Sequence, residues 1–212
     1  MPASRQESTI ADALRKQWTR LILRNIHFAG RYRRLDALYA VRDPWDMSTD
    51  AQRFRFQETN RLIEERFGHV GRMLEVGCGE GHQSEQLLKI CDDLVGVDVS
   101  KRAVERARDR CPEATFVTGD FSGPELASYE RFDLVVACEV LYYVKDVPSA
   151  LVQMEKLGRA CVVTYYSRPA EALDRYVLGI PGVESSRVEY EGSRWTVAWW
   201  QAQEKQVGAA TT

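Results

Sequence analysis

The sequence predicts an α/β fold with a mostly parallel sheet. Short apolar runs alternate with helix-like segments between residues 72 and 165, an order typical of parallel strands joined by right-handed crossovers. The first run, 72–77, breaks into glycines at positions 77, 79 and 81 before a polar helix start. Alternating glycines let the backbone turn tightly and approach a ligand closely. A ligand-binding loop is therefore expected at the end of the first strand.

The N-terminal third is expected to form helices. Apolar residues recur at helical spacing over 10–26, and two further helices are expected over 31–41 and 51–67. Asp43-Pro44-Trp45 separates these last two, because Pro restricts its predecessor and lacks an amide donor. The first helix is basic, which leaves two alternatives open: it packs on the core or a partner subunit, or it touches a membrane surface or an anionic substrate.

The rest of the chain predicts seven strands. Five are expected at 72–77, 93–98, 114–118, 132–138 and 159–165. Helices are expected between them, with Ser100 as the N-cap of one, and with Pro148 in the first turn and Gly158 at the end of another. Two more apolar or alternating runs, 187–190 and 195–200, flank a Glu-Gly-Ser turn and predict a hairpin.

Composition bounds the class of protein. The 212 residues are 44% hydrophobic and carry a net charge of −2, which suits one α/β domain with an appended segment. We divide the chain into a helical segment or lid (1–67), a catalytic domain (68–202) and a flexible tail (203–212). There is neither a membrane-length apolar run nor a secretory signal, so a cytoplasmic protein is expected. The five cysteines form no C-x-x-C pair, and no metal site is predicted.

The glycine loop favours one cofactor over another. It reads G-x-G-x-G, and His82 stands where the dinucleotide fingerprint needs a third small residue. Glu75 precedes the loop and Glu80 lies within it. Carboxylates there would repel a pyrophosphate but suit a cationic ligand. S-adenosylmethionine carries an ammonium and a sulfonium and no phosphate, so the loop favours it over NAD.

Two acids follow later strands. Asp98 and Asp120 each stand at a strand end, where open α/β sheets bind ligands. Asp98 is predicted to accept hydrogen bonds from the ribose hydroxyls, and Asp120 from the adenine amino group. Val99 and Phe121 are predicted to flank the adenine ring. The alternative for either acid is a helix cap or a loop carboxylate.

Four segments resemble the motifs of class I S-adenosylmethionine-dependent methyltransferases: LEVGCGEG at 74–81, VDVS at 97–100, VTGDF at 117–121 and FDLVVACEVL at 132–141. The resemblance covers about residues 71–201. It implies a Rossmann-like seven-stranded sheet with an antiparallel last strand, S-adenosylmethionine as cofactor and S-adenosylhomocysteine as product. It also implies that the cofactor contacts Glu75, Gly77, Gly79, Gly81, Asp98 and Asp120, and that Cys138 ends the strand beside the methyl group.

A finer resemblance links Asp43-Pro44-Trp45 and the segment 139–144 to the nodulation protein S group. Those enzymes N-methylate the glucosamine end of chito-oligosaccharides. The resemblance implies that Trp45 covers the cofactor, although stacking of Trp45 on a sugar face is an open alternative. Residues 46–52 lack the Trp-Tyr-Glu pattern of that group, which leaves the acceptor open.

Three residues are the candidates for catalysis. Glu139 follows an apolar strand and is a candidate base, an orienting group for the acceptor or cofactor, or a structural residue. Tyr142 either faces the sulfonium or the sugar, or packs in the core. His82 is a candidate base or a polar residue at a helix start.

These observations predict an enzyme that methylates an amine or hydroxyl of a small polar acceptor, with an amino sugar or oligosaccharide favoured. The alternatives are O-methylation of a natural product and a non-catalytic cofactor-binding subunit. A nucleic-acid substrate is disfavoured, because the chain lacks the Asn/Asp-Pro-Pro-aromatic motif and Cys138-Glu139 differs from the Pro-Cys pattern of cytosine modifiers. The oligomeric state is left open.

Overall fold

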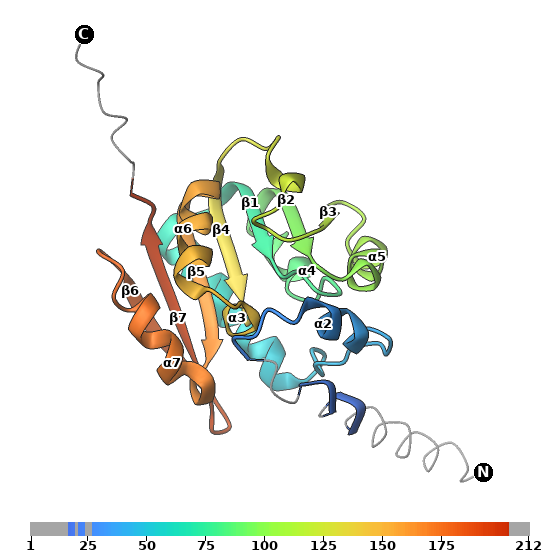
Figure 1. Ribbon diagram of the computed structural model, residues 1–212. Coiled ribbons are helices and arrows are strands. Elements are labelled where there is room, and N and C mark those ends of the chain that lie inside the picture. Colours follow the sequence, from blue (N-terminus) through green and yellow to red (C-terminus); the bar gives the residue numbers. More distant parts are fainter. Residues whose placement is uncertain (1–16, 20, 24–26, 204–212) are drawn as a thin grey trace.

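The computed structural model describes residues 17–19, 21–23 and 27–203 and shows one seven-stranded sheet (Figure 1). Its strands are β1 (Val70–Val76), β2 (Cys91–Asp98), β3 (Thr115–Thr118), β4 (Phe132–Cys138), β5 (Gly158–Tyr166), β6 (Glu184–Tyr190) and β7 (Ser193–Gln201). The order across the sheet is β3-β2-β1-β4-β5-β7-β6. Strands β1 to β5 are parallel, and β7 is antiparallel to both β5 and β6. The predicted sheet with its antiparallel last strand is confirmed.

Helices cover both faces of the sheet. They are α2 (Tyr32–Leu38), α3 (Asp50–Phe67), α4 (Ser84–Leu87), α5 (Lys101–Arg110), α6 (Val147–Leu157) and α7 (Ser167–Val177), with short 3-10 turns η1 (Pro124–Leu126) and η2 (Leu141–Tyr143). Helices α3 and α4 pack on one face against Met73 and Val162, and α6 and α7 pack on the other against Leu74 and Val163. Neighbouring residues of a strand point to opposite faces, so central strands such as β4 and β5 are buried on both sides, whereas the edge strand β6 is mostly exposed.

Local sequence signals account for several element ends. The hydroxyl of Ser100 accepts a hydrogen bond from the amide of Ala103 and caps α5, as predicted. Asp146 caps α6 in the same way through the amide of Ser149. Pro148 lies in the first turn of α6, and Gly158 ends it. Helix α4 is only one turn long, because the segment between the glycine loop and β2 is short.

Some expectations concern residues at the two ends. The basic helix expected over 10–26 falls mostly outside the described residues, of which 17–19 and 21–23 are helical. Its contact with a core, a partner or a membrane therefore stays a prediction. Residues 204–212 of the expected tail also lie outside the described part. No helix in the described part is long and apolar enough to cross a membrane, and the cytoplasmic location stays a prediction.

Helix α2 and the segment that follows it position the site. Figure 1 shows that α2 lies across the carboxyl ends of β1 and β4. The segment between α2 and α3, residues 39–49, is called the cover segment below. The Asp36 carboxylate of α2 accepts a hydrogen bond from the Ser100 hydroxyl at 2.7 Å and pairs with Arg102 at 3.1 Å. The N-terminal region is thus held against the start of α5.

Candidate active site

A cavity lies at the carboxyl ends of β1, β2 and β4, beneath α2 and the cover segment. Ligands of open α/β sheets bind at this edge. All but two of the residues predicted for the site line it: Trp45, Glu75, Gly77, Gly79, His82, Asp98, Val99, Asp120, Phe121, Glu139 and Tyr142. The structure therefore gathers residues that are far apart in the sequence around one space. Their individual roles stay predictions, but their proximity is established.

The glycine loop is built for close approach. Gly77 has a φ of +72°, and a Cβ there would lie 2.4 Å from Cγ2 of Val140. Gly79 has a φ of +53°, and a Cβ there would lie 2.9 Å from the hydroxyl oxygen of Tyr39. Both the left-handed backbone and the lack of space require glycine at these positions. The loop backbone consequently lies bare along the cavity wall.

Two predicted residues lie outside the lining of this cavity. Gly81 faces α5, where a Cβ would lie 3.3 Å from the Cβ of Ala107. Its position explains close packing of the loop on α5. Cys138 is the last residue of β4 and is partly buried. A direct contact of either residue with a cofactor stays a prediction.

Asp98 is held by the backbone around it. Its Oδ2 accepts a hydrogen bond from the amide of Gly79 at 3.0 Å, and its Oδ1 from the amide of Ser100 at 2.8 Å. Burial raises the pKa of Asp98 to about 6, even though these two amides lower it. The carboxylate thus lines the cavity and joins the glycine loop to the end of β2.

Asp120 and its neighbours form the far wall. Oδ1 of Asp120 accepts hydrogen bonds from the amide and hydroxyl of Ser122 at 2.9 and 2.7 Å. Phe121 is 8% exposed and belongs to the main core, while Val99 is partly buried. All three residues line the cavity, and an acid together with apolar side chains suits a flat ring that carries a hydrogen-bond donor. This arrangement agrees with the adenine site expected there.

Glu75 is a buried acid at the end of β1. It is 2% exposed, and its Oε2 accepts a short hydrogen bond from the Ser84 hydroxyl. Burial raises the pKa of Glu75 to about 8, and Ser84 and Arg55 offset only part of this effect. Among the described residues, no basic side chain forms an ion pair with it. A cationic ligand group would supply the missing positive charge.

Glu80 corrects one part of the sequence interpretation. Its carboxylate was expected to favour a cationic ligand, but Arg106 of α5 forms an ion pair with it. Burial acts to raise the pKa of Glu80, yet His82, Arg106 and the Asp43 amide together lower it. The charge of Glu80 is therefore satisfied within the protein. The argument for a cationic ligand depends on Glu75 alone.

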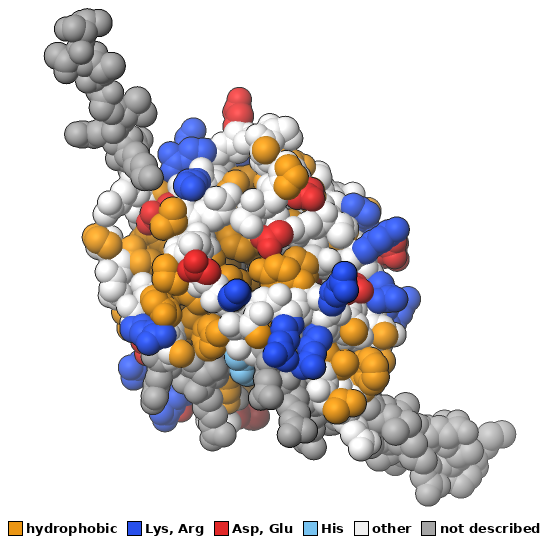
Figure 2. Space-filling view, in the orientation of Figure 1, with side chains coloured by type: hydrophobic (Ala, Val, Ile, Leu, Met, Phe, Trp, Pro, Cys, Tyr) orange, Lys and Arg blue, Asp and Glu red, His pale blue; other side chains and the backbone are white. Residues whose placement is uncertain are grey.

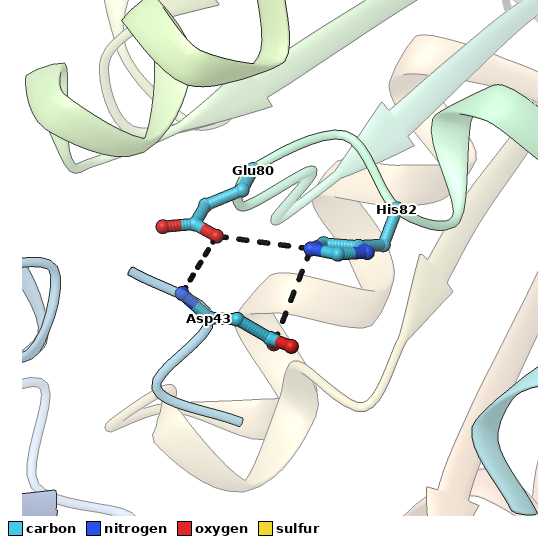
Figure 3. Close-up of side chains that lie close together, drawn as sticks. All are labelled: Asp43, Glu80 and His82. Carbon is cyan, nitrogen blue, oxygen red and sulfur yellow. Dashed lines mark hydrogen bonds and ion pairs between the residues drawn. The ribbon is translucent and has the colours of Figure 1, made fainter. Parts of the chain in front are cut away.

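Asp43, Glu80 and His82 meet at the rim of the cavity (Figure 3). The amide of Asp43 donates to Glu80 at 2.9 Å, and Nε2 of His82 lies 3.7 Å from Glu80 and 3.9 Å from Asp43. Nε2 of His82 is also 3.1 Å from Nη2 of Arg110. Two arginines therefore already stand against this trio. The contacts fit a clasp between the cover segment and the glycine loop better than a cation site, and the absence of a metal stays a prediction.

Glu139 has a strained backbone and a fixed carboxylate. Its φ is +62°, which is unusual for a residue other than glycine. Oε2 accepts from the Tyr142 hydroxyl at 2.7 Å, and Oε1 accepts from the Thr164 hydroxyl at 3.0 Å. Burial raises the pKa of Tyr142 well above its ordinary value, so its hydroxyl remains a donor. The structure thus joins two predicted catalytic residues in one hydrogen-bonded unit.

Trp45 forms part of the roof. Its Nε1 donates to the Tyr39 hydroxyl at 3.1 Å, and its ring lies 5.5 Å from the ring of Tyr143. Tyr39 is 6% exposed, and its hydroxyl also stands against Gly79. The indole therefore links η2 to Tyr39, which in turn stands against the glycine loop. This position agrees with the expected cover.

Sequence reasoning missed several lining residues, above all Arg55, Gln83 and Tyr39. Arg55 and Tyr39 come from the N-terminal region, where no motif marks them. The only signal for Arg55 is its place beside Phe56 on the face of α3 that is buried. Arg106 of α5 was also missed, because no motif includes it. It donates to the carbonyls of Val41 and Tyr39 at 2.9 Å each.

Comparison with known proteins identifies the family of this chain. The family model described as nodulation protein S (NodS) matches residues 29–164, from just before α2 to the end region of β5. The chain belongs to the nodulation protein S family. Nodulation protein S from Bradyrhizobium diazoefficiens is 38% identical over 117 residues, which are 53% of this chain and 54% of the relative. The chain thus spans about half the length of the curated relatives it matches.

Solved structures agree with the fold of this family. The N-methyltransferase NodS from Bradyrhizobium japonicum WM9, crystallised with S-adenosyl-L-homocysteine, matches with a TM-score of 0.67 and 25% identity. The match covers 82% of this chain and 98% of that chain. A ubiquinone biosynthesis O-methyltransferase from Methylococcus capsulatus is 30% identical over 117 residues, 53% of this chain and 49% of the relative. The Rossmann-like methyltransferase fold is therefore confirmed.

One face of the molecule bears on the nucleic-acid alternative. Figure 2 shows Lys and Arg side chains scattered over this face and interspersed with Asp and Glu. Proteins that bind nucleic acid gather basic side chains into a patch or stripe. The mixed charges on this face do not form such a surface.

Proposed function

We propose that the protein is an S-adenosylmethionine-dependent methyltransferase that modifies an amine or hydroxyl of a small polar acceptor, with an amino sugar or oligosaccharide favoured. One observation carries the proposal: a single cavity holds the acids at the ends of β1, β2 and β3 around a loop that has glycine at positions 77 and 79. The NodS structure crystallised with S-adenosylhomocysteine supports the same assignment.

The residues present fit this cofactor. Glu75 is a buried carboxyl without an ion pair among the described residues, which suits the ammonium group. The bare loop at Gly77 and Gly79 leaves room for the chain between the amino acid and the ribose. Asp98 would accept from the two ribose hydroxyls, and Asp120 from the adenine amino group. Val99 and Phe121 would flank the ring, and Trp45 would close the roof.

The acceptor would meet Glu139 and Tyr142. When bound, S-adenosylmethionine supplies a methyl group carried on a sulfonium sulfur, and this sulfur becomes the thioether of S-adenosylhomocysteine once the methyl group has been transferred. Methyl transfer needs the attacking atom in line with that bond, and positioning alone can supply about 7–11 kcal/mol of the barrier. Two hydrogen bonds fix the Glu139 carboxylate, so it can hold the N–H or O–H of an acceptor and take its proton. His82 is engaged at the rim and serves to position the cover segment.

An amine acceptor is favoured over a hydroxyl. The matching structure is named an N-methyltransferase, and an amine needs only to lose a proton before or after attack, whereas a hydroxyl needs a base in the transition state. Members of the nodulation protein S group N-methylate the glucosamine end of chito-oligosaccharides, which makes an amino sugar the first acceptor to test. The similarity to ubiquinone biosynthesis O-methyltransferases keeps O-methylation as the second candidate.

Calorimetric titration with S-adenosylhomocysteine tests the cofactor assignment. We expect micromolar or tighter binding to the intact protein and a loss of about 30- to 100-fold in Asp98→Ala, since hydrogen bonds to a charged group contribute about 1.5–3 kcal/mol. Asp93→Ala is the matched control, because Asp93 lies on the same strand but is exposed and pairs with Arg72. Equal binding by both variants would reject the assigned role of Asp98.

An activity assay then separates the candidate functions. Partially deacetylated chito-oligosaccharides present amines and hydroxyls together, so mass spectrometry of the product identifies the methylated atom. N-methyl product supports the favoured reading, and O-methyl product supports the second. Binding of S-adenosylhomocysteine without turnover of these or of small phenolic and sugar acceptors would favour the non-catalytic subunit.

A further inference from the structure

Thr164 of β5 contacts Glu139 through both its backbone and its side chain. Strands β4 and β5 are parallel neighbours in which Cys138 lies opposite Thr164, so Glu139 comes directly after the paired part of β4. The amide of Glu139 donates to the carbonyl of Thr164 at 2.8 Å, and the hydroxyl of Thr164 donates to Oε1 of Glu139 at 3.0 Å. A single buried residue thus holds the backbone and the carboxylate of Glu139 together.

The backbone of Glu139 needs such a contact. Its φ of +62° lies in the left-handed region, which residues with a Cβ keep only where their surroundings fix them. The chain leaves the sheet at this residue, between the end of β4 and the start of η2, and the side chain lines the cavity. Strain at one residue of a ligand cavity indicates that the orientation of this residue matters for function.

The direction of the Thr164 hydrogen bond is fixed as well. Nη1 of Arg55 lies 3.5 Å from Oγ1 of Thr164, and a guanidinium has donors only. The oxygen of Thr164 therefore accepts on that side, and its single hydrogen is left for Glu139. A hydroxyl that accepts from a cation is also the better donor, because consecutive hydrogen bonds polarise one another.

Tyr142 holds the other oxygen of the same carboxylate. Its hydroxyl donates to Oε2 of Glu139 at 2.7 Å, and its side chain is buried in the main core. One donor on each oxygen fixes the plane of the carboxylate, which a single donor leaves free to rotate. A carboxylate oxygen can accept about two hydrogen bonds, so each oxygen keeps an acceptor position that no other donor among the described residues uses.

We propose that Thr164 is a positioning residue for methyl transfer: by holding the amide and one carboxylate oxygen of Glu139, it directs the unused lone pairs of that carboxylate to the N–H or O–H of the acceptor. This inference rests on the proposed function. The acceptor atom forms a bond to the methyl carbon, the electron pair of the broken bond stays on sulfur, and the acceptor's proton passes to Glu139. Thr164 does not line the cavity and acts through Glu139 alone.

Thr164→Val tests the proposal, because it removes the hydroxyl and keeps both the shape of the side chain and the carbonyl that accepts from Glu139. With partially deacetylated chito-oligosaccharides as acceptors, we expect kcat to fall about 10- to 100-fold. The acceptor KM and the affinity for S-adenosylhomocysteine should change by less than about 3-fold. Thr164→Ser should restore most of kcat, because serine returns the hydroxyl.

Thr196→Val is the matched control. Thr196 is a buried threonine of the neighbouring strand β7 and does not line the cavity, so its kcat should stay within about 2-fold of that of the intact protein. An unchanged kcat in Thr164→Val would overturn the inference and leave the proposed function intact. An equal loss of kcat in Thr164→Ser or in Thr196→Val would also overturn it, since packing and not the hydroxyl would then be responsible.

Crystal structures of Thr164→Val with S-adenosylhomocysteine give a readout that does not depend on turnover. We expect the Glu139 carboxylate to leave its position or to occupy two conformers. The positive φ of Glu139 should be kept, because the backbone hydrogen bond remains. A single, unmoved conformer of Glu139 would overturn the inference even if kcat fell.

Tyr142→Phe gives a second route should Thr164→Val fail to fold. It frees the other carboxylate oxygen and should lower kcat by a similar factor. If both hydroxyls act through one carboxylate, the double variant loses less than the product of the two single losses. Losses that multiply would overturn the inference. Binding of S-adenosylhomocysteine by the intact protein without turnover would instead overturn the proposed function, and the inference with it.

Discussion

Two regions form the walls of the cavity, and they are held in different ways. The sheet edge, made of residues 75–81, 97–100 and 119–121, is held by backbone geometry and by hydrogen bonds of its own backbone amides, such as that from Gly79 to Asp98. The cover segment is held by side chains distant in sequence, because Arg106 binds the carbonyls of Tyr39 and Val41 and the carboxylate of Glu80. An edge held by its own backbone is thus combined with a cover segment, the roof of the cavity, that is held by side chains from elsewhere in the sequence.

The difference assigns different tasks to the two regions. The edge must present fixed groups to a ligand whose chemistry never changes. Under the proposed function the roof would open for exchange of that ligand, and elements that move belong to the less stable parts of a structure. Substitutions at the edge should therefore alter global stability or the cofactor affinity, whereas substitutions in the roof should alter local opening.

The largest expected effect tests the rigidity of the edge. Gly77→Ala combines a left-handed φ with a Cβ placed 2.4 Å from Val140, so we expect the free energy of unfolding to fall by about 3–4 kcal/mol. Gly182→Ala is the matched control, because Gly182 has a φ of +74° and free space around its Cβ position. It should lose only about 1 kcal/mol. Urea denaturation measures both, and similar losses would show that strain alone, not packing, fixes the loop.

The second effect weakens the attachment of the cover segment and leaves the sheet edge unchanged. Arg106→Met leaves the buried carboxylate of Glu80 without its cation and frees two carbonyls of the cover segment, at a cost of about 2–3 kcal/mol. Hydrogen exchange should show faster exchange in residues 39–49 and little change in β1 and β4.

Arg102→Met supplies the control for that experiment. Arg102 lies on the same helix and pairs with Asp36, but its side chain is 54% exposed. Exposed ion pairs contribute about 0–1 kcal/mol, so exchange in the cover segment should hardly change. If Arg106→Met raised exchange throughout the sheet, the roof and the edge would be one cooperative unit and the comparison would be wrong.

What the sequence could predict follows the same division. Leu74–Gly81, Asp98 and Asp120 were found because each lies within a few residues of a glycine or a strand end that the ligand site needs. The seven-stranded sheet with its antiparallel last strand followed from the resemblance, and the alternation of strands and helices was readable directly. Local signals were sufficient for this half of the molecule because local geometry holds it.

The cover half was less predictable for a physical reason. Its residues contact partners that are far away in the sequence. Arg55 lies near Gln83 and Thr164, which are 28 and 109 residues away. Arg106 binds Tyr39, which is 67 residues away. No spacing rule in one sequence reveals such pairs. Glu80 was misread for this reason, because nothing near it announces that Arg106 would take its charge. Only Trp45 was identified, and then by resemblance.

The third prediction concerns the protonation of the buried carboxyl groups at the sheet edge. Burial raises the pKa of Glu75 to about 8 in the folded protein. A folded-state pKa above the unfolded value means that the folded form binds the proton more tightly, so stability is full at acid pH and is lost as pH rises toward 8. Asp98 contributes in the same direction only up to about pH 6.

Between pH 6 and 8, the free energy of unfolding should therefore fall by about 2 kcal/mol because of Glu75. Urea denaturation at several pH values measures this slope, and Glu75→Gln should remove most of it. Saturating S-adenosylhomocysteine should flatten the slope as well, since an ammonium beside Glu75 favours the ionised form. A slope that survives in Glu75→Gln would place the titrating group elsewhere.

The smallest expected effect separates two contributions within the roof. Trp45→Phe removes the hydrogen bond from Nε1 to the Tyr39 hydroxyl but keeps an aromatic ring against Tyr143. We expect S-adenosylhomocysteine to bind about 2- to 5-fold more weakly, equivalent to about 0.5–1 kcal/mol. Trp45→Ala removes the ring as well and should weaken binding further, because the cavity then opens to water. If Trp45→Phe and Trp45→Ala weakened binding equally, the roof would act through the single bond to Tyr39, and therefore through the glycine loop that Tyr39 touches, rather than by covering the ligand.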